Sequence, residues 1–282
     1  MQRIAPSLYS YENDCNITET TINEEPQDYK PSRGEVIVIA ILKKYGFLTT
    51  SLIQRLMNLH GHAKLNALKI LRKMQQQKKM QKFTISFNSE RQDINIYVLP
   101  RKIRTANKVR NQFKYDMTDI PYVLEHLSVT QWHISVLEGS KAKEIYAFKQ
   151  INQEGFIAQI PSLIEVRTKL GTRMNLCALP VPKGVHKQDL GRLFTNIITI
   201  DKYLVARKDR FKAYVIVLIC ESESQIEEVS LMLREMGEIK EIYILYSIDV
   251  MTSEENLDPL KIMYDVNRAE GETKLEVCRL RD

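Results

Sequence analysis

Apolar residues recur at helical spacing in three closely spaced stretches near the N-terminus of the chain. The first stretch, residues 36–45, predicts a helix, and Gly46 follows it where a C-terminal cap glycine is expected. The second begins at Thr49 or Thr50, since either side chain can cap the N-terminus of a helix. Gly61 ends this second helix, and a third helical stretch follows it.

The third stretch begins near His62 or Ala63 and predicts a helix with two unlike faces. Apolar residues occupy one face, and basic and polar residues occupy the other. The apolar face comprises Leu65, Leu68, Leu71 and Met74, and the polar face comprises Lys64, Asn66, Lys69, Arg72 and Lys73.

Two alternating stretches follow the third predicted helix. Apolar and polar residues alternate from Phe83 to Phe87 and again from Ile94 to Val98, with the polar segment 88–93 between them. Alternation on both sides of a polar tip predicts a β-hairpin. Three short helices followed by a hairpin are typical of a winged helix-turn-helix, which we expect over residues 32–100.

The second half of the chain predicts alternating strands and helices, beginning with a helix that Pro121 opens and that ends near Gly139. The expected strands are 144–151, 156–159, 162–170, 174–181, 214–220 and 242–248, and the expected helices are 187–208 and 224–236. This order predicts a three-layer α/β domain over residues 121–250. Residues 251–282 are expected to form a C-terminal hairpin or arm.

Positive charge is concentrated in one segment. Between His62 and Lys114 there are fourteen Lys or Arg and two acidic residues, a local net charge of +12 in a chain whose total is +6. Such a concentration indicates a surface that binds the phosphates of a nucleic acid. Residues 1–31 hold six acids and two bases and are expected to form a flexible acidic arm. Residues 101–120 are predicted to be a basic linker that follows the DNA backbone.

The third predicted helix supplies the residues best placed to read DNA. In a helix-turn-helix, the first turns of the recognition helix face base edges, whereas other cations position the protein on phosphates. We therefore expect base contacts from His62, Lys64, Asn66 and Lys69, backbone contacts from Lys73, Arg101, Lys102 and Arg104, and a minor-groove or backbone contact from Arg91. Two other interpretations are a solvated helix face and a protein-interaction module.

Cysteine usage and hydropathy argue against several other classes of protein. The four cysteines, Cys15, Cys177, Cys220 and Cys278, form no Cys-x-x-Cys pair, so free thiols in a reducing cytoplasm are expected and no metal site is predicted. No apolar run approaches the ~20 residues that cross a bilayer, and no secretory signal is recognised, so no membrane contact is expected. Nothing in the sequence predicts a bound cofactor.

The layout from Pro121 to Ile248 resembles the core of the PD-(D/E)xK nuclease fold. That fold places an Asp at the end of the second strand and an acid-x-Lys pair on the third, which together hold Mg²⁺ and activate water. Here Ser162 stands where the Asp is expected, and the following strand, residues 175–180, contains neither an acid nor a Lys. The resemblance therefore implies a nuclease-like domain without catalytic residues, kept for scaffolding, dimerisation or contact with a relaxase.

Four segments carry a second resemblance: Ile41 to Thr50, the leucine series from Leu65 to Leu71, Trp132-His133 and Pro161-Ser162. On these segments the chain, over roughly residues 34–220, resembles the replication-relaxation family of plasmids and conjugative elements. The resemblance implies a winged helix joined to a nuclease-like domain. It implies a double-stranded DNA-binding accessory protein, not an enzyme, that assists a relaxase or replication initiator at an origin of transfer or replication.

Two alternative functions stay open at this point. The first is a transcriptional regulator with the same winged helix, whose α/β domain binds a ligand or dimerises. The second is an active nuclease that uses Glu165 and a distant acid such as Asp189. A homodimer fits either regulatory or accessory DNA binding, because symmetric half-sites require one, although the chain has no heptad seam.

Overall fold

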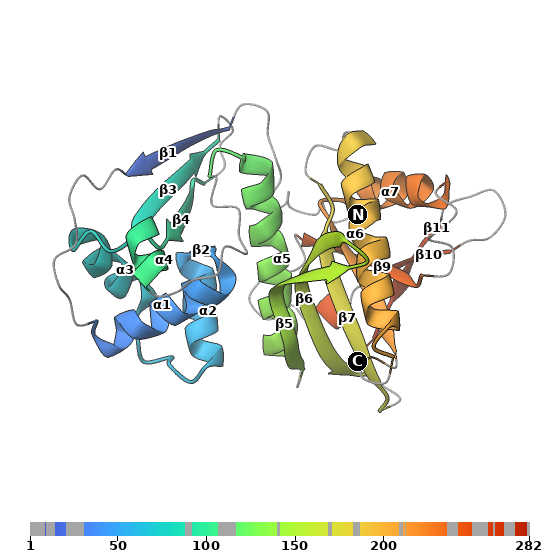
Figure 1. The fold of residues 1–282 in the computed structure, drawn as a ribbon, viewed down its shortest axis with the longest axis horizontal. Coiled ribbons are helices and arrows are strands. Elements are labelled where there is room, and N and C mark those ends of the chain that lie inside the picture. The colour runs from blue at the N-terminus through green and yellow to red at the C-terminus, as the bar shows by residue number, and fades with distance from the viewer. Residues whose placement is uncertain are drawn as a thin grey trace. The chain divides into compact units, whose positions relative to one another are not determined.

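The structure, a computed structural model, divides into two units, each with its own sheet and helices (Figure 1). The N-terminal unit comprises residues 11–123, and the C-terminal unit comprises residues 1–10 and 124–282. The chain is therefore of the α+β class. No described helix combines the length and hydropathy that a bilayer-spanning segment needs. The structure describes residues 9, 15–20, 31–87, 92–106, 117–139, 142–168, 171–182, 187–208, 211, 213–235, 242–249, 259–261, 263–267 and 274–280.

The N-terminal unit contains short helices and a four-stranded sheet. The sheet has the order β1-β3-β4-β2, and each neighbouring pair is antiparallel. The predicted hairpin is therefore present as β3 and β4, and part of the predicted N-terminal arm forms β1 beside β3. The elements are β1 (Asn16–Thr20), α1 (Arg33–Tyr45), β2 (Phe47–Thr49), α2 (Thr50–Leu59), α3 (Ala67–Gln76), β3 (Gln81–Ser86), β4 (Ile94–Val98) and α4 (Arg101–Ala106).

Local signals set both ends of α1 and the start of α2, and the predicted cap residues Gly46 and Thr49 are confirmed. At the start of α1, the Ser32 backbone N–H donates to Glu35 Oε2 at 2.7 Å. At its end, Gly46 adopts a φ of 79°, a left-handed conformation that a residue without a Cβ reaches at little cost. Thr49 caps α2, because its Oγ1 accepts from the Leu52 N–H at 3.3 Å.

The third helix begins later than the position near His62 that the apolar pattern predicts, so that prediction is wrong. Residues 62–65 form turns and bends, and α3 starts at Ala67. Asn66 is the N-cap, since its Oδ1 accepts from the Lys69 N–H at 2.9 Å. A side chain that satisfies one of the unpaired N–H groups in the first turn marks the helix start better than apolar spacing does.

The later start changes which residues of α3 face the core. Ala67 and Leu71 are buried, whereas Leu68 is 38% exposed, so the predicted placement of Leu68 on the apolar face is wrong. The helix also approaches α1 closely. A Cβ added to Gly34 would lie 2.8 Å from Cδ1 of Ile70, so the missing side chain at Gly34 gives α3 room to pack.

The C-terminal unit contains a seven-stranded mixed sheet of order β11-β10-β9-β8-β7-β6-β5. β8 runs parallel to β7 and to β9, and the other neighbouring pairs are antiparallel. The predicted order of strands and helices is confirmed, except that the stretches 156–159 and 162–170 belong to one strand. The elements are α5 (Ile120–Gly139), β5 (Lys143–Gln153), β6 (Phe156–Arg167), β7 (Arg173–Pro180), α6 (Lys187–Val205), β8 (Tyr214–Cys220), α7 (Glu223–Glu235), β9 (Ile244–Ile248), a 3-10 turn (Pro259–Lys261), β10 (Met263–Asn267) and β11 (Lys274–Cys278).

β5 lies at one edge of this sheet and is irregular. It joins β6 through Glu154 and Gly155, whose φ angles of 54° and 84° are those of a type I′ hairpin turn. Its pairing with β6 shifts register between Glu144 and Tyr146. Further along, Phe148 has a φ of 50°, a left-handed conformation that is costly for a bulky residue.

Helices cover both faces of the seven-stranded sheet (Figure 1). α6 and α7 bury one face in a core that includes Leu163, Cys177 and Ile216. α5 lies against the other face, where its His126 ring stacks on Phe148 of β5 at a centroid distance of 4.2 Å. Successive residues of a strand point to opposite faces, so Leu163 meets α6 while its neighbour Ser162 meets α5.

Candidate nucleic-acid interface

One side of α3 is open to solvent and carries most of the charge of the helix. Its buried side packs against α1 and α2 and includes Ala67, Leu71 and Met74. The opposite side repeats at the spacing of one helical turn, so its side chains form a continuous strip. The exposed residues are Leu68, Lys69, Arg72, Lys73 and Gln76, named below the α3 strip.

Gln54 of α2 holds the start of α3 in place. Its Oε1 accepts from the backbone N–H of Ala67 at 2.8 Å, and its Nε2 donates to the Leu65 carbonyl at 3.1 Å. Nε2 also lies 2.9 Å from Oδ1 of Asn58. The amide of Gln54 therefore satisfies backbone groups on both sides of the cap residue and sets the direction in which α3 leaves the turn.

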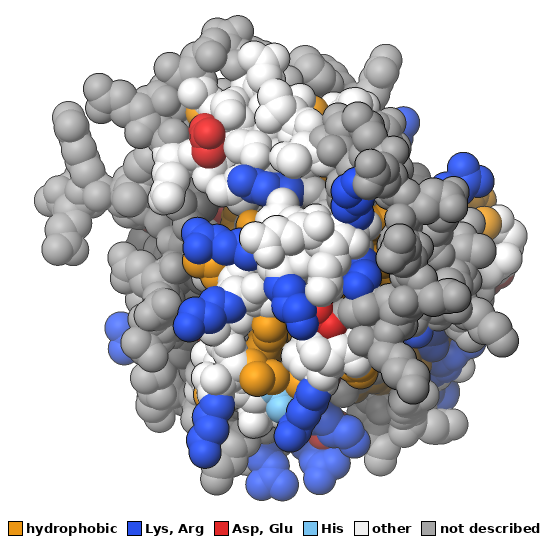
Figure 2. Space-filling view, turned by 90° about the vertical axis from the view of Figure 1, so that its left-hand side faces the viewer, with side chains coloured by type: hydrophobic (Ala, Val, Ile, Leu, Met, Phe, Trp, Pro, Cys, Tyr) orange, Lys and Arg blue, Asp and Glu red, His pale blue; other side chains and the backbone are white. Residues whose placement is uncertain are grey.

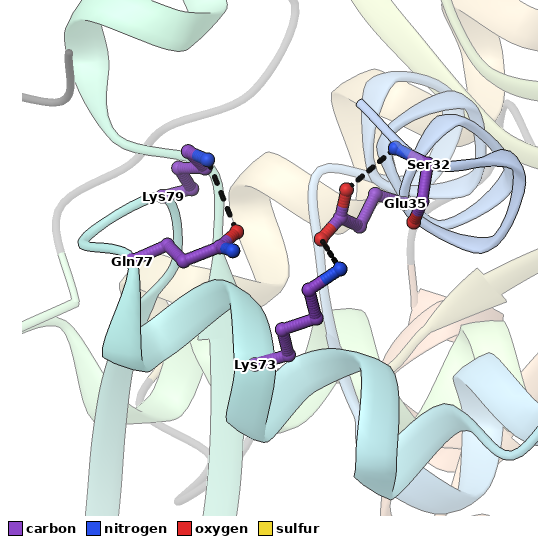
Figure 3. Close-up of polar contacts among 5 residues, drawn as sticks. All are labelled: Ser32, Glu35, Lys73, Gln77 and Lys79. Carbon is purple, nitrogen blue, oxygen red and sulfur yellow. Dashed lines mark hydrogen bonds and ion pairs between the residues drawn. The ribbon is translucent and has the colours of Figure 1, made fainter. Parts of the chain in front are cut away.

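Lys73 is tied to α1 (Figure 3). Its Nζ lies 3.4 Å from Oε1 of Glu35, whose other carboxylate oxygen accepts from the Ser32 N–H. Glu35 is 1% exposed, whereas Lys73 is 54% exposed, so the pair joins a buried acid to a solvated cation. Part of the charge of Lys73 is thus used within the unit, and its contribution to an anion-binding surface is reduced.

Lys79 lies just beyond α3 and is buried. Its Nζ donates to Oε1 of Gln77 at 3.0 Å, as Figure 3 shows. Burial lowers the pKa of the Lys79 ammonium, while the nearby carboxylate of Glu35 opposes this effect and Lys73 adds to it. Lys79 therefore belongs to the packing beneath α3 and not to its outer surface.

Two cations of the α3 strip have no carboxylate partner among the described residues. The Lys69 ammonium and the Arg72 guanidinium are both exposed and make no ion pair there. Figure 2 shows the face of the N-terminal unit on which Lys and Arg side chains gather, with few Asp or Glu between them. Unpaired cations on a rigid helix form a surface that attracts anions.

The predicted site residues, apart from Arg91, lie on α3, just before α3 or on α4. Lys69 and Lys73 lie on the α3 strip. His62, Lys64 and Asn66 precede the helix: Lys64 is exposed, His62 is half-buried, and the side chain of Asn66 is engaged as the cap.

Three further predicted residues, Arg101, Lys102 and Arg104, lie on α4. Of these, Arg101 is exposed and Arg104 is half-buried, while the side chain of Lys102 and the whole of Arg91 lie outside the described residues. The predicted contacts do not include Leu68, Arg72 or Gln76, although the sequence already places Arg72 on the polar face of the helix. Leu68 is missed because the apolar pattern places it on the buried face. A signal for the true start of α3 is present in the sequence, since Asn66 is a preferred N-cap.

A buried polar chain in the C-terminal unit links α5 to two strands. Nδ1 of His133 lies 2.7 Å from Oγ of Ser162, and Nε2 lies 3.0 Å from Oε2 of Glu144. The chain brings together the two dipeptides Trp132-His133 and Pro161-Ser162. The order of the three side chains resembles that of a nucleophile, a base and an acid, but Ser162 and His133 are both buried.

Glu165 of β6, which the nuclease hypothesis uses, lies near a cation. Its Oε1 is 3.7 Å from Nη1 of Arg173. Within the described part of the chain, no three His, Cys, Asp or Glu side chains are grouped to hold a metal ion. The side chain of Asp189, the second acid of that hypothesis, lies outside the described residues.

No family model, curated protein or solved structure matches this chain.

Proposed function

We propose that the N-terminal unit is a winged helix that binds double-stranded DNA, with α3 in the major groove and the β3–β4 hairpin as the wing. One observation carries the proposal: the outer side of α3 presents Lys69 and Arg72 without described acidic partners, on a helix fixed to α1 and α2. The local charge of the sequence supports it, because the segment from His62 to Lys114 is strongly basic.

The chemistry of the α3 strip suits base edges. Arg72 can donate two parallel hydrogen bonds to guanine, and Gln76 can pair with adenine in the same way. Leu68, an exposed apolar residue between them and the helix start, suits the methyl group of thymine. Lys69 and Lys64 are suited to phosphates or to guanine. In this proposal Asn66 acts on the position of the helix, because its Oδ1 already accepts from the Lys69 N–H.

A selection from a randomised duplex library, followed by gel shifts, tests DNA binding. We expect a preferred site that the Arg72→Ala variant binds about tenfold more weakly, the cost of one lost bidentate base contact. Affinity should fall steeply with salt, since cations that contact phosphates release counterions. Arg192→Ala, which removes an exposed arginine from α6, is the matched control and should bind within about twofold of the unchanged protein.

Two results would reject the DNA-reading role of α3. One is a library selection that yields no preferred duplex. The other is equal affinity of the Arg72→Ala and Arg192→Ala proteins for the selected site. A melting curve for each variant shows whether a loss of binding reflects a loss of fold.

The proposal extends to the biological setting that the family resemblance implies. We infer an accessory protein of a mobile element, with the C-terminal unit contacting a relaxase or replication initiator. A relaxase gene next to this gene would identify the candidate partner, and a gel shift with and without the purified relaxase tests that part. A larger complex that forms only with both proteins and the preferred DNA supports it, and independent binding of the two proteins rejects it.

A further inference from the structure

We propose that the C-terminal unit carries a separate phosphate-binding site, formed by Lys149 of β5 and Arg207 just after α6 and positioned by Tyr203. The ligand class is a phosphate group, either on a phosphorylated small molecule or in a nucleic-acid backbone. This proposal does not depend on α3 or on the function proposed for it.

Aromatic rings hold the two cations in place. Lys149 Nζ lies 3.9 Å from the centroid of the Tyr146 ring and 5.9 Å from that of Tyr203, and it donates to Tyr203 Oη at 3.4 Å. Arg207 Cζ lies 3.8 Å from the same Tyr203 centroid, and its Nη1 donates to the Tyr203 carbonyl at 3.1 Å. Both cations thus lie within 6 Å of one ring, which is itself buried.

The rings of Tyr203 and Tyr146 pack against the hydrophobic core of the C-terminal unit. Tyr203 belongs to the core between α6 and the sheet, and the Tyr146 ring meets Phe211 edge-on at 6.4 Å. Backbone hydrogen bonds also shape the turn after α6, where the Arg207 N–H donates to the Leu204 carbonyl at 3.0 Å. The two cations are therefore fixed before any ligand arrives, which lowers the entropy cost of binding.

No described carboxylate neutralises either cation. Two acids on neighbouring segments have other partners: Glu154, in the turn after β5, pairs with Lys202 at 3.2 Å, and Asp201 of α6 accepts from the hydroxyl of Tyr214. A ring face attracts a cation but carries no net charge, so the pair of cations keeps its full positive charge. Two cations beside one ring, with no described acid paired to either, attract an anion.

The donors that stay unused fit a phosphate. Lys149 keeps two of its three N–H groups, and the exposed guanidinium of Arg207 keeps its remaining N–H groups beyond the one bound to the Tyr203 carbonyl. Arginine and lysine together are the usual partners of phosphate oxygens, the former as a planar fork and the latter as a point charge.

Isothermal titration of the full chain with inorganic pyrophosphate and with a 20-bp duplex tests the site. The test variant is Lys149→Gln with Arg207→Gln, and the matched control is Lys202→Gln, which removes a neighbouring cation that already has an acid. We expect the test variant to lose about tenfold or more in affinity for at least one probe, as two lost charge-assisted hydrogen bonds imply, and the control to stay within about twofold.

The two probes separate the sources of the phosphate. Weaker pyrophosphate binding identifies a site for a phosphorylated small molecule, and weaker duplex binding alone identifies a backbone contact. Equal affinities of the test and control variants for both probes would overturn the proposal. If melting curves show that the double variant unfolds at a lower temperature than the unchanged protein, the affinities of the single variant Arg207→Gln are compared with those of the control instead. This single change is suitable because Arg207 is exposed. Arg72→Ala should leave the affinity for pyrophosphate unchanged. A negative result in this test can therefore be told apart from a negative result in the test of α3.

Discussion

The side-chain Oε1 of Gln54 in α2 accepts a hydrogen bond from the backbone N–H of Ala67, the first residue of α3, at 2.8 Å. The first N–H groups of a helix have no partner within the helix, so a polar side chain from a neighbouring helix satisfies one of them here. The orientation of α3 relative to α2 thus depends on a polar contact as well as on apolar packing.

Gln54→Ala should destabilise the N-terminal unit by about 1–3 kcal/mol, because Ala67 N–H and the Leu65 carbonyl lose their partner in a half-buried position. Urea unfolding of the two proteins measures this difference. Asn58→Ala is the control, since it removes only an exposed side-chain contact of the same amide and should cost less than about 0.5 kcal/mol. Equal costs for the two variants would show that the contact with the α3 backbone contributes nothing.

Lys78→Gly should stabilise the protein by about 0.5–1 kcal/mol although it removes a side chain. Lys78 follows α3 with a φ of 58°, and its N–H and that of Lys79 donate to the carbonyls of Gln75 and Met74, the pattern of a Schellman cap. Glycine is the usual residue at this position because the left-handed conformation brings a Cβ too close to the following carbonyl.

The control for this substitution is Lys78→Ala, which removes the same charge but keeps the Cβ. It should leave the midpoint of urea unfolding nearly unchanged or lower it. If the alanine variant gains as much as the glycine variant, the gain comes from removing the charge and the conformational explanation is wrong.

The stability of the C-terminal unit should fall as pH rises above 9. Burial raises the pKa of the Cys177 thiol to about 12, from 9.0 in the unfolded chain. Between these values the folded state holds a proton that the unfolded state releases, so the free energy of unfolding decreases with pH. The expected loss between pH 7 and pH 10 is about 1.4 kcal/mol for this group.

Urea unfolding of the protein and of Cys177→Ala at pH 7, 9 and 10 measures this effect. The alanine variant is less stable at pH 7, because a buried sulfur is lost, but its stability should decrease less with pH. Parallel pH curves would contradict the prediction. Burial also raises the pKa of Tyr264 to about 12, helped by its hydrogen bond to Glu223, so both proteins should lose further stability above pH 10.

Ser162→Ala should cost about 1–3 kcal/mol, because Nδ1 of His133 is left without its partner in the interior. The matched control is Ser128→Ala, which removes another buried hydroxyl that bonds only to the Glu125 carbonyl within the same helix. Thermal unfolding compares the two. A cost for Ser162→Ala no larger than that of the control would mean that the link between α5 and β6 is energetically unimportant.

Local signals allowed part of this fold to be predicted. The ends of α1 and α2 follow from Gly46 and Thr49, whose conformational and hydrogen-bonding preferences act within a few residues. The alternating pattern predicts two strands, 156–159 and 162–170, on either side of Pro161, where the structure has the single strand β6. The strand continues through Pro161, since there it is paired with β5 alone and pairing with β7 begins at Ser162.

The candidate site was harder to predict, because it depends on contacts distant in sequence. The exposure of Lys69 and Arg72 follows from their charge and helical position, but Leu68 is recognised as exposed only from the packing of α3, whose start is set by the contact of Gln54 with Ala67. The cluster of Lys149, Tyr203 and Arg207 joins an edge strand to the end of a helix more than fifty residues later. Hydrophobic periodicity along the chain does not predict that these residues come together.

The irregular edge strand β5 has a consequence for the behaviour of the protein in concentrated solution. A straight outer strand offers its free peptide groups to any other chain and can seed aggregates. The register shift near Glu144 and the left-handed conformation of Phe148 interrupt the straight row of peptide groups along β5. A strand of a neighbouring molecule could therefore pair with only a few consecutive residues. Removing the register shift, for example by deleting Ile145, the extra residue between Glu144 and Tyr146, should make the protein more prone to form fibres.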